Sequence, residues 1–337
     1  MKNIKLFLDA GWLNMKDIIE LGYPFTFITG ARQIGKTYGA LTYLIDNHIP
    51  FIYMRRTQKE LLACKSDALS PFSVINRDRP GYDIRAKNMA ADVIGFYNDD
   101  TLICPGVALT TLHNVRGISG SAYNVILYDE FIPEKIARPI KGEFDAWNNA
   151  YMTLNSNREL TGSKPMQFIG LANSNAAANP LFMGLGLVQT LERVKKEKRI
   201  FWTDEARGIL LVNVEASPIS QKHKETALGK LTAGTDFARM AFENEYAFDD
   251  FSNIESRSLR EYKPLVTVGE ITIYKHKGKR DYFVSLHLAG SCEHFGSNER
   301  EIEAFARSYW RLRDYYLDGY VYFENYLAKV LFIKYTN

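Results

Sequence analysis

The amino-acid sequence predicts an α/β protein with a parallel sheet covered by helices on both faces, followed by a helical linker and a small α+β domain. Apolar runs typical of buried strands alternate with helical segments over the first two thirds of the 337 residues. A glycine-rich loop directly follows the first of these strands. Near the end of the chain the apolar spacing changes to the period of two that half-buried strands show.

Each predicted element follows from the spacing of apolar residues and from turn and capping residues. Thr57, for example, stands where it can cap the helix that follows the basic pair Arg55 and Arg56. Helices are predicted at residues 13–21, 36–46 and 57–68, and strands at 25–29, 50–54, 123–128, 167–172 and 209–214. The interrupted pattern between about 70 and 105 predicts a small hairpin insertion.

These elements define three predicted parts of the chain. Residues 1–215 hold the parallel sheet, and residues 216–262 are a helical linker. Residues 263–337 form the small α+β domain. Within it, residues 271–288 are typical of two strands about a Lys-Gly-Lys turn, and residues 298–317 of one amphipathic helix rich in aromatics and arginines.

The composition excludes several classes of protein. Hydrophobic residues make up 46% of the chain, which excludes fibrous and disordered proteins, and a net charge of +3 is too small to identify a nucleic-acid partner. No apolar run approaches the ~18–20 residues that cross a bilayer, and the N-terminus lacks a signal peptide's apolar core. We therefore expect a soluble, intracellular protein with no membrane partner. Three widely spaced cysteines argue against disulfides and a zinc site.

Residues 30–37 read GARQIGKT and fit the pattern G-x-x-x-x-G-K-[ST] of a phosphate-binding loop between a strand and a helix. Backbone N–H groups and the helix dipole attract phosphate there, Lys36 is placed to reach the β- and γ-phosphates, and Thr37 to bind Mg²⁺. The alternative is an ordinary glycine turn. The predicted nucleotide-binding residues are Gly30, Ala31, Arg32, Gln33, Ile34, Gly35, Lys36, Thr37 and Tyr38. The sheet is thus predicted to be that of a RecA-like, ASCE-type P-loop nucleoside triphosphatase.

A later strand ends in two adjacent carboxylates, Asp129 and Glu130. Because alternate strand residues face opposite ways, Asp129 can hold magnesium while Glu130 orients and deprotonates a water for attack on the γ-phosphate. Such a base favours an ATPase or motor over a small-molecule kinase, which transfers phosphate to a bound hydroxyl. GTP specificity is not expected, because the chain has no N/T-K-x-D segment. The alternative is a solvated acidic strand end.

Three polar residues, Asn173, Ser174 and Asn175, follow the strand at 167–172. At the end of a buried strand they are placed to sense the γ-phosphate. The alternative is a turn whose side chains bond to their own backbone.

Three arginines are candidates for the positive charge that stabilises the γ-phosphate in hydrolysis. Arg158 is the first candidate for a finger acting across subunits, and Arg116 is the second. Arg32, inside the loop, can act in cis. The alternative for each is a surface salt bridge.

Five segments resemble a known family in order and spacing: GARQIGKTY, FIYMRR, ILYDEF, LANSNAAANPLF and GKLTAGTDFARMAFENEYAFDD. A phosphate loop with Arg-Gln inside it is similar to that of the large-terminase type of viral DNA-packaging ATPase. Over about residues 25–255, the chain more closely resembles the small packaging ATPases of short-tailed phages that replicate by protein priming.

The resemblance implies a homomeric ring, a pentamer, that docks at the portal of an empty capsid and hydrolyses ATP with Mg²⁺ to drive double-stranded DNA inward. Such a motor acts in the host cytoplasm, transiently on the procapsid, and is not expected in the mature virion. A structural packaging RNA is a further implied partner. By motif position, Asp129 and Glu130 keep the roles given above, Arg158 is the trans-acting finger, and Arg116 is similar to a second trans-acting residue.

The C-terminal domain departs from the pattern of full-length terminases, whose ribonuclease H-like domain cuts DNA with a metal-binding Asp on its first strand. Here the corresponding strand, residues 271–278, has lysines where that Asp should stand, so we predict a vestigial nuclease domain without cleavage activity. Four basic residues of this segment are candidate contacts to DNA or RNA phosphates: Lys275, Lys277, Lys279 and Arg280. The alternative is a solvated hairpin tip.

The leading hypothesis is therefore an ATP-driven DNA translocation motor. Two alternatives stay open: a complete terminase with an active nuclease, and a P-loop module that binds nucleotide as a switch without hydrolysing it. Glu130 argues against the switch, because a protein that only binds nucleotide has no need of a base.

Overall fold

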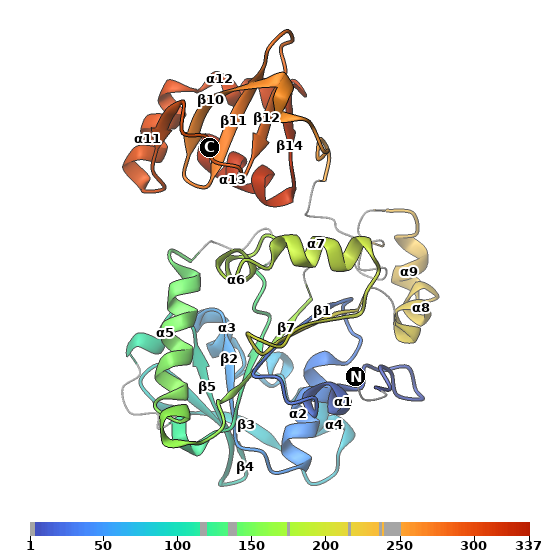
Figure 1. Ribbon diagram of the computed structural model, residues 1–337. Helices are drawn as coiled ribbons and strands as arrows, with labels where there is room; N and C mark the ends of the chain where they lie inside the picture. The colour runs from blue at the N-terminus through green and yellow to red at the C-terminus, as the bar shows by residue number, and fades with distance from the viewer. Residues whose placement is uncertain are drawn as a thin grey trace. The chain divides into compact units, whose positions relative to one another are not determined.

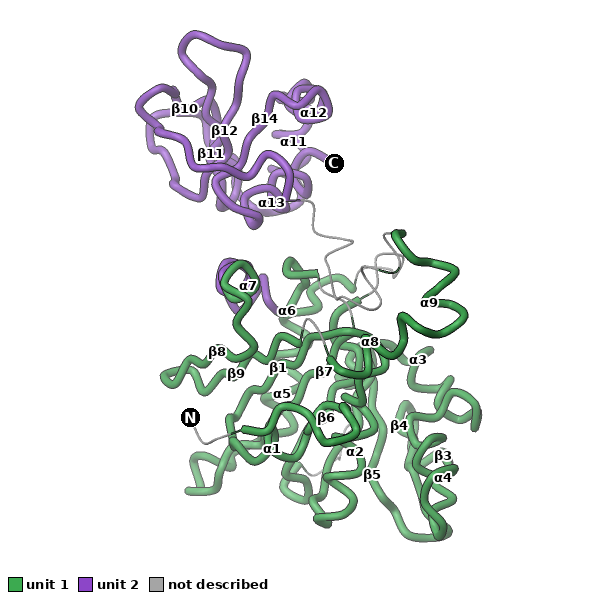
Figure 2. Tube along the Cα trace, turned by 90° about the vertical axis from the view of Figure 1, so that its right-hand side faces the viewer, with its two compact units in different colours: residues 1–181, 194–248 green, residues 182–193, 249–337 purple. Residues whose placement is uncertain are grey.

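A computed structural model describes residues 4–114, 120–133, 140–173, 176–214, 217–235, 238 and 251–337. The chain divides into two compact units, which Figure 2 distinguishes by colour. The first consists of residues 1–181 and 194–248, and the second of residues 182–193 and 249–337. The division at 248/249 falls inside the predicted linker at 216–262. The predicted boundaries of the three parts stay predictions.

The described part of the first unit is built on a nine-stranded mixed sheet in the order β3-β4-β5-β2-β6-β7-β1-β9-β8. Figure 1 labels β1, β2, β3, β4, β5 and β7 of this sheet. All neighbours from β5 to β9 pair in parallel, while β3, β4 and β8 add antiparallel pairs at the two ends. The strands are β1 (Phe25–Gly30), β2 (Phe51–Arg55), β3 (Ile84–Ala90), β4 (Val93–Asn98), β5 (Thr101–Ala108), β6 (Val125–Asp129), β7 (Gln167–Ala172), β8 (Phe201–Asp204) and β9 (Ile209–Val214). The parallel centre confirms the predicted sheet.

Helices cover both faces of this sheet, as predicted. Adjacent strand residues point into different cores: Ile169 packs with Leu41 of α2 on one face, whereas the Phe168 ring lies 5.2 Å from that of Trp147 on the other. The helices are α1 (Met15–Ile19), α2 (Lys36–Asp46), α3 (Gln58–Ala63), α4 (Ser73–Asp78), α5 (Glu143–Asn155), α8 (Pro218–Lys224) and α9 (Ala227–Leu231), with α6 (Pro180–Gly184) and α7 (Val188–Lys196) across the division.

Two parts of this unit differ from the sequence prediction. The segment at 70–105 is not a separate insertion, because its hairpin of β3 and β4 continues into β5, which pairs in parallel with β2. α5 was not predicted, because it contains Asn148, Asn149 and Asn155, and asparagine is a weak helix former. Packing of its aromatic residues on the sheet outweighs that propensity.

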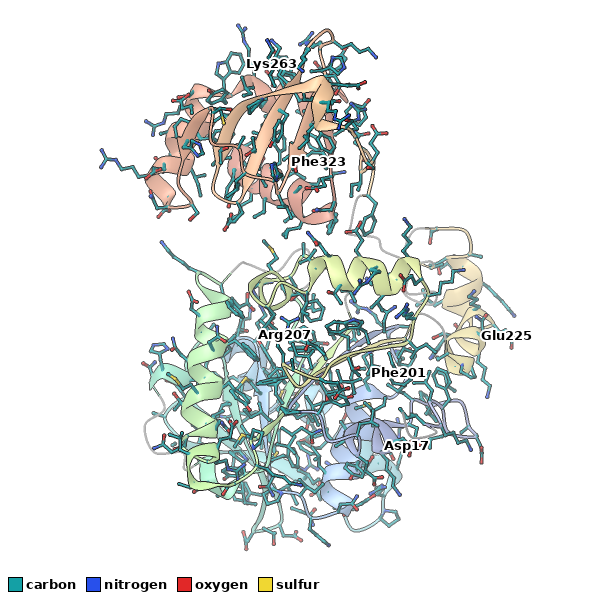
Figure 3. The ribbon with its side chains drawn as sticks, viewed as in Figure 1. Asp17, Phe201, Arg207, Glu225, Lys263 and Phe323 are labelled. Atoms are coloured by element: carbon teal, nitrogen blue, oxygen red, sulfur yellow. The ribbon has the colours of Figure 1, made fainter. Side chains whose placement is uncertain are left out.

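The described part of the second unit contains a five-stranded sheet in the order β13-β10-β11-β12-β14. Its strands and helices are β10 (Tyr262–Val268), β11 (Ile271–His276), β12 (Tyr282–Ser285), β13 (Glu293–Phe295), α11 (Glu299–Ser308), α12 (Arg311–Leu317), β14 (Val321–Phe323) and α13 (Tyr326–Thr336). Phe305, Leu312 and Phe332 bring the three helices into one core with Ile273. Phe323 is fully buried in the same core (Figure 3). This unit has the expected α+β character.

Two sequence predictions for this unit are wrong. The strand at 271–278 is not the first, because β10 precedes it and pairs with it antiparallel. The single helix predicted at 298–317 is two helices that break at Tyr309. The Tyr309 ring stacks on Phe305 and its hydroxyl donates to Glu293 at 2.8 Å, contacts that sequence spacing does not show. The likeness to ribonuclease H stays a prediction.

The segment that enters the second unit is fixed to the unit's last strand and last helix. Ile254 forms a parallel bridge with Phe323, and the Glu255 N–H donates to the Phe323 carbonyl at 3.0 Å. The buried Lys329 amine donates to the carbonyl and hydroxyl of Ser252 at 2.9 and 3.1 Å. These contacts cover the outer edge of β14.

Candidate active site

The predicted phosphate loop lies between β1 and α2, as its sequence pattern requires. Gly35 has a φ of 93°, and a Cβ there would also meet the Trp12 ring at 3.3 Å. A Cβ on Gly30 would lie 2.9 Å from the carbonyl oxygen of Val214 in β9. Gly35 is therefore required by the turn into the helix, and Gly30 by the close approach of β1 and β9.

Lys36, the lysine of the loop, is almost fully buried. Its Nζ donates to the carbonyls of Ala31 at 2.7 Å and Gly30 at 3.1 Å. Burial lowers the pKa of Lys36 to about 7, because the ammonium loses its water; Asp129 opposes this shift and the positive Arg32 adds to it. A phosphate bound by the loop would compete with the two carbonyls for the ammonium and favour its charged form.

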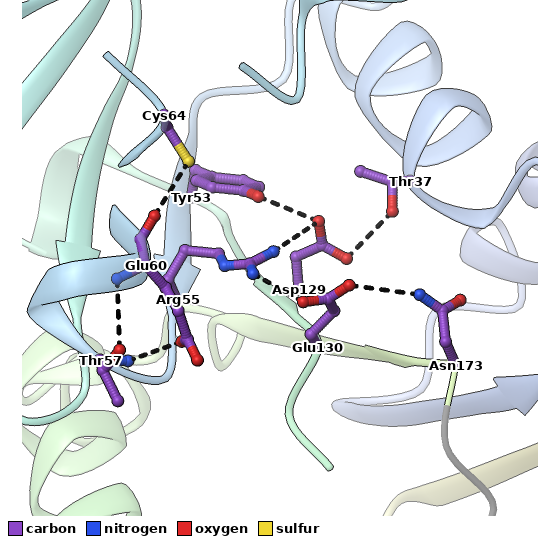
Figure 4. A network of polar contacts seen from close by, with 9 residues as sticks. All are labelled: Thr37, Tyr53, Arg55, Thr57, Glu60, Cys64, Asp129, Glu130 and Asn173. Atoms are coloured by element: carbon purple, nitrogen blue, oxygen red, sulfur yellow. Dashed lines mark hydrogen bonds and ion pairs between the residues drawn. The ribbon is translucent and has the colours of Figure 1, made fainter. Parts of the chain in front are cut away.

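Asp129 lies beside the loop at the end of β6 (Figure 4). It accepts hydrogen bonds from the Thr37 hydroxyl at 3.0 Å and from the Tyr53 hydroxyl at 2.9 Å. Burial raises the pKa of Asp129, an effect that the guanidinium of Arg55 opposes. A hydroxyl and a carboxylate at this place are the oxygen ligands that Mg²⁺ takes in P-loop sites, together with phosphates and water, so the donor set fits magnesium.

Glu130 follows with a φ of 57°, an uncommon conformation for a residue other than glycine. Its carboxylate is held from two sides, by Arg55 at 2.6 Å and by the Asn173 amide at 3.3 Å (Figure 4). The side chain is still 48% exposed, so water can reach it. The strained turn thus directs an accessible carboxylate toward the ends of two neighbouring strands.

Sequence reasoning assigned no role to Arg55 and Tyr53, which reach this site from the end of β2. Arg55 also lies 3.5 Å from Asp129, so one guanidinium contacts both carboxylates. Parallel strands end at the same edge of a sheet, and β2 pairs with β6. The available signal was therefore the basic residue directly after an apolar strand.

The neighbouring Arg56 makes a different contact. It forms a bidentate ion pair with Glu143 at 2.6 and 2.8 Å, and both side chains are buried. Glu143 is the first residue of α5, so this pair fixes the start of that helix to the end of β2.

The remaining site predictions divide into three groups. Asn173 lies in the site, and Arg32 is exposed on the loop. Ser174, Asn175 and Arg116 lie outside the described residues. Their roles stay predictions.

Arg158 lies near the amino-terminal ends of the parallel strands, whereas Asp129 and Glu130 lie at the carboxyl-terminal ends. It follows α5 and donates to the Asn124 side chain at 3.1 Å and to the Ser121 carbonyl at 3.3 Å. Asn124 directly precedes β6, and Asp129 is the last residue of β6. Asn124 and Asp129 are therefore about 16 Å apart along the strand. Arg158 is therefore not part of the site formed by its own chain.

A cavity of about 900 Å³ opens beside the phosphate loop. Its walls include Lys36, Thr37 and Asn173, and also Trp12 from the segment before α1. This volume is in the range of small-molecule sites. The cavity therefore extends from the candidate phosphate site to Trp12, a residue outside the sequence motifs.

The four basic candidates of the second unit lie on the β11–β12 hairpin. Lys277 donates to the Arg260 carbonyl at 2.7 Å, and the Arg280 guanidinium lies 4.5 Å from the Tyr315 ring centroid. Lys275 and Lys279 are exposed. Two of the four charges are thus engaged within the unit, and contact with nucleic acid stays a prediction.

Other expectations concern metals, thiols and membranes. The described ranges hold no group of three or more His, Cys, Asp or Glu side chains arranged for a metal ion. Cys64, Cys104 and Cys292 are free thiols. Within the same described ranges, no helix combines the length and the apolar character that crossing a bilayer requires.

Sequence comparison decides the family. Residues 9–273 match the profile of the podovirus DNA encapsidation protein (Gp16) family. The chain belongs to this family. The DNA packaging proteins of Bacillus phages PZA and phi29 are each 28% identical to it over 250 residues, which cover 73% of this chain and 69% of theirs. The resemblance predicted from the motifs is confirmed.

Solved structures share the fold of nearly the whole chain. A chain of the bacteriophage phi29 viral genome packaging motor assembly superposes with a TM-score of 0.70 at 20% identity, over 96% of this chain and 99% of that one. A chain of the phi28 gp11 DNA packaging motor gives 0.65 at 19% identity, over 98% of both. At these identities the likeness concerns the fold alone, and it extends past the residues that match the family profile.

Proposed function

We propose that this encapsidation-family protein is an ATP-driven motor that translocates double-stranded viral DNA into a preformed capsid. The observation that carries the proposal is the convergence of Lys36 and Thr37, which follow β1, with Asp129 and Glu130 at the carboxyl end of β6, two parallel strands on either side of β7. The DNA substrate is supported by the relatives from phages PZA and phi29, which are DNA packaging proteins.

In this proposal each residue of the site has one chemical task. Lys36 binds the β- and γ-phosphates, and Thr37 and Asp129 hold Mg²⁺, which neutralises phosphate charge when bound. Glu130 takes a proton from water as the water oxygen bonds to the γ-phosphorus and ADP departs with the bridging oxygen. Asn173, which donates to Glu130, is placed to respond to that change.

Arg158 completes the site of a neighbouring copy rather than its own. Its position at the amino edge of the sheet supports this assignment, since its own carboxylates lie at the other edge. Repeated head-to-tail contacts of this kind close into a ring when the rotation permits. We propose a pentamer that docks on the portal of a procapsid in the host cytoplasm, absent from the mature virion, with a structural RNA as a further partner.

Steady-state ATP hydrolysis, measured with and without double-stranded DNA, tests the proposal. DNA should stimulate turnover. Glu130→Gln should still bind ATP but lose ~10²–10⁴-fold in rate, because it removes the base and keeps the shape of the side chain. Full activity of Glu130→Gln, or turnover that no DNA concentration changes, would contradict the motor.

Mixing two inactive variants tests the finger. Arg158→Ala should bind ATP yet lose ~10³-fold or more in turnover. Combined with Glu130→Gln, it should regain activity, because some mixed interfaces contain an intact base and an intact finger. Arg207→Ala, at an exposed arginine of the same unit (Figure 3), is the matched control and should stay fully active. Failure to regain activity counts against action across subunits.

A further inference from the structure

Residues 6–14 form a short hairpin that is attached to the phosphate loop. Phe7 forms an antiparallel bridge with Leu13. The Leu13 N–H in turn donates to the Ile34 carbonyl, inside the loop, at 2.9 Å. The hairpin is therefore held at a fixed position relative to the groups that bind phosphate.

This hairpin presents Trp12 on the wall of the cavity. The side chain lies against the loop backbone, since a Cβ on Gly35 would be 3.3 Å from Trp12 Cε3, yet Trp12 is 41% exposed. Leu8, beside it on the same wall, is also exposed. Tryptophan usually buries most of its large surface, so core packing does not account for this exposed ring.

The strand order gives the direction of a nucleotide bound by the loop. Its γ-phosphate has to face Asp129 on β6, which lies to one side of β1. The neighbour of β1 on the other side is β9, and the next helix along the chain is α8. α8 packs on the hairpin, because a Cβ on Gly11 would lie 2.9 Å from Pro218, and its His223 lines the cavity. The nucleoside end therefore points toward the hairpin and α8.

We propose that Trp12 stacks on the base of the bound nucleotide, so that the hairpin at 6–14 forms the base subsite. A flat aromatic face beside an apolar side chain recognises the π-face of a base. The inference deepens the proposed ATPase function and rests on it, because the phosphate loop must first hold the triphosphate. Stacking of one base on one aromatic side chain corresponds to about 10-fold or more in affinity.

Calorimetric titration of the full-length protein with ATP and with inorganic tripolyphosphate, both with Mg²⁺, tests the subsite. Trp12→Ala should weaken ATP binding about 10-fold or more and leave tripolyphosphate binding unchanged, because only ATP carries a base. Trp12→Phe keeps a ring and should keep most of the affinity. Trp310→Ala, at a tryptophan of the second unit that is 59% exposed, is the matched control and should bind both ligands normally.

Tryptophan fluorescence gives a second readout. ATP should quench the emission of the unmodified protein, and Trp12→Phe should remove that quenching while ATP still binds. Unchanged ATP affinity in Trp12→Ala overturns the inference, and so does an equal loss for tripolyphosphate. If Lys36→Ala abolishes ATP binding while Trp12→Ala leaves the ATP affinity unchanged, the base subsite fails while the ATPase proposal stands. Absence of ATP binding by the unmodified protein overturns both.

Discussion

At the scale of single residues, Arg55 contacts both carboxylates of the site. It donates to Glu130 at 2.6 Å and lies 3.5 Å from Asp129, while Lys36 donates to backbone carbonyls. In the proposed mechanism, water has to reach a Glu130 carboxylate whose two oxygens are in contact with Arg55 and Asn173. We therefore propose that hydrolysis is linked to a movement of the Arg55 side chain at the end of β2.

The lowered pKa of Lys36 predicts that ATP binding takes up a proton. Burial brings this pKa down to about 7, and a bound phosphate raises it again, because an anion favours the ammonium. Above pH 7 the amine of the free protein is mostly neutral and must gain a proton on binding, so ATP affinity falls as the pH rises. Below pH 7 the amine is already charged and the uptake disappears.

Calorimetry in two buffers of different ionisation enthalpy, at about pH 6 and about pH 8.5, measures this uptake. Lys36→Arg is the control, because its side chain is charged at both pH values and only the titration of ATP itself then contributes. Equal proton uptake by both proteins at the higher pH would rule out the lysine as the group that titrates.

Residues that form a contiguous pattern could be predicted from the sequence, and residues brought together by the sheet could not. The phosphate loop and the Asp129–Glu130 pair are local patterns, and each lies where the pattern places it. The role of Arg55 depends on β2 pairing with β6, a neighbour about 70 residues away. That of Trp12 depends on a hairpin folding back over the loop. The spacing of residues within either segment shows neither the pairing of β2 with β6 nor the contact of the hairpin with the loop.

At the scale of elements, α5 runs from the carboxyl-terminal ends of the parallel strands of the first unit to their amino-terminal ends. It begins at Glu143, which is paired with Arg56, the residue after the Arg55 that contacts Asp129 and Glu130, and Arg158 follows its C-terminal end. With 13 residues the helix is about 20 Å long. In the proposed ring, a rigid element of this length would set the distance between the site of one subunit and the Arg158 that it contributes to the next.

The buried ion pair at the start of α5 predicts that removal of one partner destabilises the protein much more than replacement of both partners. Arg56→Met should lower the free energy of unfolding by about 3–5 kcal/mol, because it leaves the Glu143 carboxylate buried without a partner. The double variant Arg56→Met with Glu143→Leu should recover most of this loss, since two apolar side chains replace two charges. Urea unfolding followed by circular dichroism measures both values.

Arg79 offers a matched comparison. It pairs with Asp46 in the same unit at 2.6 Å, but both side chains are partly exposed. Water and salt screen such a pair, so Arg79→Met should cost no more than about 1 kcal/mol. Equal losses in Arg56→Met and Arg79→Met would mean that burial of the first pair has no energetic consequence.

Elements could be predicted where periodicity was strong and missed where it was weak. β1, β6, β7 and β9 are buried on both faces and show continuous apolar runs, which is why each was found. The residues of β8 are only half-buried, and its apolar signal is correspondingly short. The break between α11 and α12 comes from the packing of Tyr309, not from a glycine or proline.

At the scale of the whole molecule, the second unit predicts an absence of nuclease activity. Its adjoining strands β10, β11 and β12 contain no Asp or Glu, and nucleases that use two metal ions need carboxylates to hold them. Supercoiled plasmid incubated with the purified protein and Mg²⁺ or Mn²⁺ should therefore stay intact. Nicking that copurifies with the protein through successive columns would restore the complete terminase as the better hypothesis.

The attachment of residues 252–255 to β14 and Lys329 also determines how the second unit bears mechanical load. A pull on the preceding chain reaches the rest of the unit only after the two hydrogen bonds between Lys329 and Ser252 and the backbone pairing of residues 254 and 255 with Phe323 have broken. Resistance to such a pull is set by an unfolding rate. In the proposed motor, where a subunit works against tension, this attachment would keep the second unit from being pulled open at its amino-terminal end.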